Sequence, residues 1–148
     1  MFVAAVMKLI AALSCTLFTG AAVYINLVEH PARMGLDTKT AATVWAPSYK
    51  RATVMQASLA ILSFTAGVLT WLLSCGIGWL ICAVVIGSVV PFTFAAIMPT
   101  NHRLLEPDRN LASDETRKLL EKWGKLHAVR SGLGLLASVI YLVLLLGA

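Results

Sequence analysis

Apolar residues in this chain are gathered in four long blocks separated by polar segments, without the strict alternation of half-buried strands. The blocks span about 3–29, 49–74, 79–98 and 120–146. Each approaches or exceeds the roughly 20 residues that a helix needs to cross a bilayer. The pattern predicts an all-α fold in which residues 1–148 form a single domain, an integral membrane four-helix bundle.

The segment before the last block has the pattern of an amphipathic helix. Ser113 followed by Asp114 and Glu115 is typical of a helix start, because acidic residues there meet the positive end of the helix dipole. Apolar positions then recur at helical spacing, with Lys and Arg on the other face. We therefore predict that this helix extends beyond the membrane and continues unbroken into the last span.

Prolines predict where the other helices end or bend. His30 precedes Pro31, which disfavours helical geometry at the end of the first block, and Pro99 is expected to end the third helix. Pro91 lies inside the third block and leaves the carbonyl group of Gly87 without its donor, which predicts a kink there.

The first polar region is expected to be a loop over about 31–48, interrupted by Pro47. Within it, Asp37 is expected to cap a short helix that ends at Trp45. Trp45 also fits an aromatic belt at the membrane surface.

Composition supports the membrane assignment and suggests an orientation. The chain has 148 residues, of which 59% are hydrophobic and 13% are charged, whereas soluble domains have about 25% charged residues. Apart from Lys8, its Lys and Arg residues lie within or beside the polar regions 30–50 and 100–125. Because short cytosolic loops collect basic residues, we expect both regions in the cytosol and both termini on the opposite side. This explains the net charge of +5 without nucleic acid as a partner.

Candidate chemistry centres on Trp123, His127 and Arg130. Their spacings of four and three residues place them on one face of a helix, where the chain enters lipid. Polar groups at that depth are costly unless they are paired or used. The predicted topology brings other polar residues to the same membrane face. These are Glu29, His30, Arg33, Asn101, His102 and, about two turns deeper, Gln56. The simplest alternative is that any membrane protein with short loops collects its polar residues at one interface.

Three motifs in the sequence carry a resemblance to a known family. They are His30-Pro-x-Arg33, Pro99-x-Asn101 and Trp123-x-x-x-His127-x-x-Arg130. With them, nearly the whole chain resembles a family of small four-helix membrane proteins that includes fungal anthrone oxygenases. Most other members have no known function. The resemblance implies oxidation of a tricyclic anthrone to a quinone by molecular oxygen, without an evident cofactor.

On that reaction, His127 is expected to be the base that removes a proton from the acidic carbon of the anthrone, since imidazole titrates near neutral pH. Arg130 or Asn101 is expected to stabilise the oxygen of the resulting enolate, and Trp123 to stack on the substrate. The apolar substrate is expected to enter from the bilayer.

Other site residues have less defined roles. His30 with Glu29 is expected either to orient the substrate or to supply the alternative base. Arg33 and Gln56 are further candidate substrate-binding residues.

Two alternatives keep the fold and change the function. In the first, His30, His127 and Glu29, with His102, hold a transition metal, because these ligand types suit iron, copper or zinc. In the second, the protein is a non-enzymatic membrane subunit or a lipid- or quinone-binding protein. That alternative predicts that His127→Ala leaves function intact while changes at the packing glycines Gly132 and Gly134 do not. A homo-oligomer is compatible with either.

Overall fold

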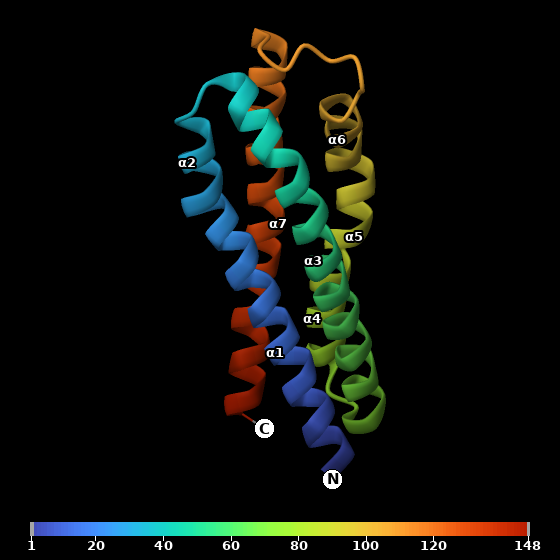
Figure 1. The fold of residues 1–148 in the computed structure, drawn as a ribbon. Helices are drawn as coiled ribbons and strands as arrows, with labels where there is room; N and C mark the ends of the chain where they lie inside the picture. The colour runs from blue at the N-terminus through green and yellow to red at the C-terminus, as the bar shows by residue number, and fades with distance from the viewer. Residues whose placement is uncertain (1, 148) are drawn as a thin grey trace.

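The computed structural model describes residues 2–147 as four long helical rods that run up and down beside one another (Figure 1). The first rod comprises α1 (Phe2–Tyr24), the π-helical turn η1 (Ile25–Glu29) and α2 (His30–Met34). The second is α3 (Thr38–Ser74). The third comprises α4 (Ile77–Gly87), α5 (Val89–Phe92), the π-helical turn η2 (Thr93–Ile97) and α6 (Met98–Leu104), and the fourth is α7 (Asp114–Leu146). All four rods are long and apolar enough to cross a membrane. The predicted all-α four-helix architecture is confirmed.

Large apolar side chains cover the outside of the bundle, as expected for rods that face lipid. Leu13, Leu72 and Val143, from three of the rods, are among many that are more than half exposed. A protein surrounded by water rarely exposes so much contiguous apolar surface. The outer surface therefore has the apolar character expected of a surface in contact with lipid.

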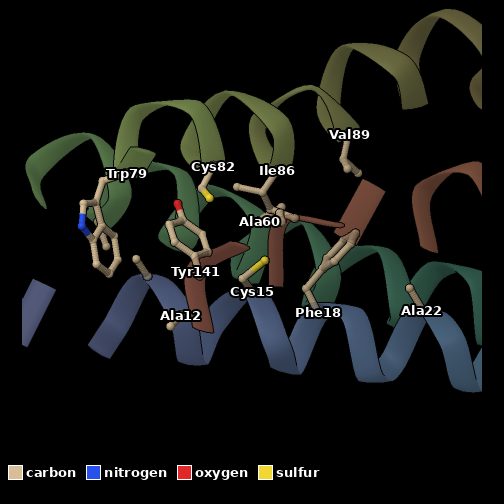
Figure 2. Packing of buried hydrophobic residues seen from close by; sticks show 13 residues of the cluster. Ala12, Cys15, Phe18, Ala22, Ala60, Trp79, Cys82, Ile86, Val89 and Tyr141 are labelled. Atoms are coloured by element: carbon tan, nitrogen blue, oxygen red, sulfur yellow. The ribbon is translucent and has the colours of Figure 1, made fainter. Parts of the chain in front are cut away.

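The interior below the polar end is packed with small and aromatic residues. Cys15 and Phe18 of α1, Cys82 and Ile86 of α4, and Tyr141 of α7 point toward one another between the rods (Figure 2). All five are fully buried. Small side chains let the helix backbones approach closely, which is how helices associate where lipid removes the hydrophobic driving force.

Two prolines that were expected to end helices lie instead inside continuous rods, so those predicted ends are wrong. A π-helical turn precedes each proline: the backbone N–H of His30 donates to the carbonyl of Ile25, and that of Met98 donates to Thr93. A proline ring normally clashes with the carbonyl group four residues earlier. The wider π turn accommodates that clash, so the helix continues past Pro31 and Pro99.

The first polar region also differs from its prediction. Asp37 caps a helix as expected, because its Oδ1 accepts from the Thr40 amide at 3.0 Å. Hydrogen bonding to the Thr40 hydroxyl, and secondly to the Thr40 amide, lowers the pKa of the Asp37 carboxyl. However, the helix is not short: α3 passes through Pro47 and continues to Ser74. The expected loop over 31–48 shrinks to residues 35–37, since a transmembrane helix tolerates the loss of one hydrogen bond at proline when it is packed against neighbours.

One prediction for the third rod stays untested, and one for the fourth rod is confirmed. In the third rod, Ser88 separates α4 from α5 three residues before Pro91. The Ser88 backbone is helical and its N–H donates to the Val84 carbonyl at 2.9 Å, so the expected kink stays a prediction. Ser113 Oγ accepts from the Thr116 amide at 3.2 Å and begins α7, which runs unbroken as predicted. The polar regions 30–50 and 100–125 are mostly helical extensions of the rods and not loops. They lie at the end of the bundle opposite the start of α1 and the end of α7 (Figure 1).

Candidate active site at the polar end of the bundle

The predicted face of α7 is buried at the polar end of the bundle. Trp123, His127 and Arg130 are 4%, 3% and 8% exposed, so all three are turned inward. The Trp123 and His127 rings stack with centroids 4.9 Å apart. Edge contact with Trp45 at 5.8 Å and a tilted contact with His30 at 5.3 Å enclose Trp123 further. The indole ring therefore holds two histidines from different rods in place.

His127 is oriented by an asparagine outside the predicted set of site residues. Asn26, in η1, lies with its Oδ1 2.7 Å from His127 Nδ1. The same Oδ1 accepts from the Ser131 hydroxyl at 2.6 Å, and Asn26 Nδ2 donates to the Gly124 carbonyl at 3.0 Å. One side chain of the first rod thus bonds three positions of α7.

These contacts decide which nitrogen of His127 can act as a base. The Gly124 carbonyl can only accept, so the amide nitrogen of Asn26 must face it and Oδ1 must face His127. An amide oxygen can only accept, so His127 Nδ1 carries the proton. The lone pair of the neutral imidazole is therefore on Nε2.

Arg130 is a buried cation without a carboxylate partner. Its Nη2 donates to Gln56 Oε1 at 3.0 Å, and its guanidinium lies over the Phe18 ring at 5.6 Å. Within residues 2–147, no Asp or Glu oxygen lies within 4.0 Å of it. A charge held this way is costly, which makes Arg130 a site for a group with negative charge.

A second polar group closes the upper side of the site. Glu29 forms an ion pair with Arg33 one turn along the first rod. The Ser48 hydroxyl of α3 also donates to Glu29, and Arg33 donates to Ser48 at 3.3 Å. Because this pair is internally neutral, Arg130 remains the uncompensated cation of the site.

These groups surround a small enclosed cavity of about 10 Å³. That is room for about one water molecule. Its walls are formed by Ile25, Glu29, Arg33, Ser48, Tyr49, Ala52, Thr53, Gln56, Ile97, Trp123, His127 and Arg130. Six of the eight candidate residues proposed from the sequence thus meet at one cavity.

Several buried nitrogens of the lining residues have no hydrogen-bond partner. They are Nε and Nη1 of Arg33, Nε2 of Gln56, Nε1 of Trp123 and Nε of Arg130. All of them are N–H donors. These donors are available to acceptor atoms of water or of a ligand. Unpartnered buried atoms also occur away from the cavity, at Trp45 and Asn101.

The other predicted residues lie apart from the cavity. His30 is buried against Trp123 and against Gly124, where a Cβ would come within 2.4 Å of the His30 ring, but it does not line the cavity. Asn101 is fully buried on α6, with its Nδ2 3.9 Å from the sulfur of Met98. His102 is exposed. Over the described range 2–147, no group of three or more His, Cys, Asp or Glu side chains is arranged to hold a metal ion.

Sequence reasoning missed residues that carry no charge. Asn26, Ser48, Tyr49 and Thr53 complete the site from the first and second rods. Asn26 lies one helical turn before Glu29, and Tyr49 flanks the predicted aromatic belt, so spacing alone offered a weak signal for both. Nothing in the sequence indicated that the π turn would bring Asn26 onto α7.

Comparisons with known proteins point to one family. The family model described as anthrone oxygenase matches residues 45–140, which include His127 and Arg130. The anthrone oxygenase tpcL of Aspergillus fumigatus is 43% identical over 68 residues, which cover 44% of this chain and 42% of that protein. The matched part thus spans less than half of that relative's length. No solved structure matches. Since the family model covers more than half of the chain, this protein belongs to the anthrone oxygenase family.

Proposed function

We propose that this protein is a membrane-embedded oxygenase that converts an anthrone-like aromatic substrate to the quinone with O₂. His127 is the base, and Arg130 stabilises the enolate oxygen. No cofactor takes part in this scheme. Family membership and the anthrone oxygenase relative support the reaction class.

The observation that carries the proposal is the buried, uncompensated cation of Arg130 among unpartnered N–H donors. Removing a proton from the acidic carbon of an anthrone places negative charge on the carbonyl oxygen across the ring. Fixed donors at the place where charge develops lower the barrier, and they do so most in a site without water. The lining therefore suits the enolate better than it suits the neutral ketone.

The proton is taken by Nε2 of His127, which the contacts of Asn26 leave unprotonated. General bases of this kind contribute about 10²- to 10⁴-fold to rates.

Oxygen then completes the reaction. The electron-rich carbon of the enolate reduces O₂ and forms a C–O bond, and the proton held by His127 returns to give a hydroperoxide. Loss of the remaining C–H proton breaks the O–O bond, so that a carbonyl group and one water molecule form. The methylene carbon loses four electrons and O₂ gains them.

Quinone formation by purified protein in lipid vesicles tests the proposal, with a hydroxylated anthrone as substrate and spontaneous oxidation as background. We expect His127→Gln to lower kcat/KM by about 10²-fold or more. The matched control is His102→Gln, which removes an exposed histidine outside the cavity and should retain wild-type activity. Arg130→Met is expected to lower kcat more than it raises KM, because its charge acts on the enolate.

Other outcomes would redirect the proposal. A wild-type rate equal to the background rejects this oxygenase activity and favours the non-enzymatic lipid- or quinone-binding alternative. Loss of activity on adding a chelator, with stoichiometric metal in the purified protein, would favour the metal-dependent alternative. In that alternative His30, His127 and Glu29 hold the metal. Equal rates for His127→Gln and His102→Gln would reject His127 as the base.

A further inference from the structure

The cavity beside His127 and Arg130 is too small for a tricyclic substrate. Sites for molecules of that size occupy about 300–1,000 Å³, whereas this cavity measures about 10 Å³. The rings must therefore lie largely outside it, or reach it through a neighbouring space. Two hollows lie between the second and third rods. The inner one is next to the cavity, and the outer one is next to the inner one.

The inner hollow has a volume of about 80 Å³ and lies beside the cavity. Thr53 and Arg130 line both spaces. The rest of its wall is almost wholly apolar and comes from α3 and the third rod: Ala57, Ala60, Val89, Val90, Thr93, Phe94 and Met98. Arg130 is therefore the charged end of an otherwise apolar passage.

The outer hollow is an open groove of about 550 Å³ on the face of the bundle that contacts lipid. Ala60 and Val90 join it to the inner hollow. Its walls are Ile61 and Phe64 of α3 and, on the third rod, Val84, Gly87, Ser88 and Pro91. Ser88, the residue between α4 and α5, lies in this wall.

We propose that this groove, with the inner hollow, is the entrance through which a flat apolar substrate passes from the bilayer to Arg130. We name it the α3–α5 entrance and define it by the lining of the two hollows. The inference rests on the proposed function. The groove has the volume and the apolar walls that a tricyclic ring system needs, and its inner end meets the donor that binds the oxygen of such a ring.

Another apolar hollow provides the comparison. It measures about 270 Å³ and lies between the first and fourth rods, along Val23, Leu27 and Leu135. Its only polar side chains are Asn26 and Ser131, which are bonded to each other and to His127. It shares no lining residue with the cavity. A molecule bound there would contact Asn26 and Ser131 and would lie away from Arg130.

Photocrosslinking tests occupancy without requiring turnover. Val90→p-benzoylphenylalanine places a photoreactive group in the entrance, and Leu135→p-benzoylphenylalanine places one in the comparison hollow. In phosphatidylcholine vesicles with tritiated 2-methylanthraquinone, we expect a saturable adduct at position 90 at least about fivefold above that at position 135. Equal or unsaturable labelling would mean simple partitioning into lipid and would overturn the proposal.

Blocking the passage tests its use. Ala57→Phe fills the inner hollow and is expected to lower kcat/KM for the anthrone at least about tenfold, while the adduct at position 90 persists. Gly132→Phe is the control: a Cβ there meets no atom within 4 Å, and Gly132 lines the comparison hollow but neither hollow of the entrance. It should retain wild-type kcat/KM.

The two proposals fail separately. If wild-type protein shows no turnover, the oxygenase proposal fails, while the labelling ratio still decides whether an aromatic ring occupies the entrance. Full activity in a folded Ala57→Phe variant, or an equal loss in Gly132→Phe, would reject the entrance and leave the oxygenase proposal standing. If Ala57→Phe does not fold, the labelling ratio decides.

Discussion

At the scale of single residues, Asn26 determines what His127 can do. Its amide is fixed by the Gly124 carbonyl, so its oxygen receives the protons of His127 Nδ1 and of Ser131. An imidazole held on one side by an acceptor has a defined tautomer and a defined ring direction. An uncharged residue thus gives a titratable neighbour its role, as the aspartate of a serine protease triad does for its histidine.

Asn26→Leu is expected to lower kcat at least about tenfold, with a smaller change in KM, because His127 then populates both tautomers. Labelling His127 with ¹⁵N should show a larger share of the form protonated on Nε2. Asn26→Asp keeps the acceptor for His127 and Ser131 and should retain more activity than Asn26→Leu. An unchanged tautomer in Asn26→Leu would contradict the assignment.

At the scale of helices, each of the two π turns precedes a proline and lies beside the site. The turn before Pro31 carries Asn26 and Glu29, and the turn before Pro99 carries Ile97, which lines the cavity. A π turn rotates the following residues relative to a regular helix. The two prolines that were predicted to end helices therefore follow π turns that set the direction of side chains at the site.

Close packing of α1 against α7 depends on one of two glycines. A Cβ at Gly134 would lie 2.8 Å from Thr19 Oγ1 and 2.9 Å from Phe18, whereas a Cβ at Gly132 would meet nothing within 4 Å. Of the two predicted packing glycines, Gly134 is confirmed and Gly132 is wrong, because it faces outward.

We expect Gly134→Val to destabilise the bundle by about 1–3 kcal/mol through overpacking. Gly132→Val should leave the free energy of unfolding within about 0.5 kcal/mol of wild type. Denaturation in mixed micelles measures both. Equal destabilisation by the two variants would show that helix propensity, and not the α1–α7 contact, is responsible.

At the scale of the whole molecule, the basic residues other than Lys8 lie at the same end of the bundle as the candidate site. The opposite end has the uncharged turn between α3 and α4, where Cys75 adopts a left-handed conformation with φ of 53°. Cys75 is exposed, while Cys15 and Cys82 are buried. The Cys75 thiol can therefore report which side of the membrane this end of the bundle faces.

If the basic end is cytosolic, a maleimide that does not cross membranes should label Cys75 in intact cells. His102→Cys in a Cys75→Ser background places the thiol at the basic end and should react only after permeabilisation. Labelling with the reverse pattern would invert the predicted topology, with the basic regions outside.

From the sequence alone we could predict the number of spans, the all-α fold, the helix start at Ser113 and the α7 face formed by Trp123, His127 and Arg130. These follow from local properties: the length of apolar blocks, helix capping and helical periodicity. Six of the eight candidate residues meet at one cavity, because topology collects polar groups at one end of a bundle.

The packing of the rods against one another sets which of those groups touch. It separated His30 and Asn101 from the cavity, brought Asn26 onto His127 and, within residues 2–147, left Arg130 without a carboxylate. Each result depends on the rotation and depth of one rod against another. Contacts between rods and π turns at prolines set these quantities, and neither is encoded in the spacing of residues along a single helix.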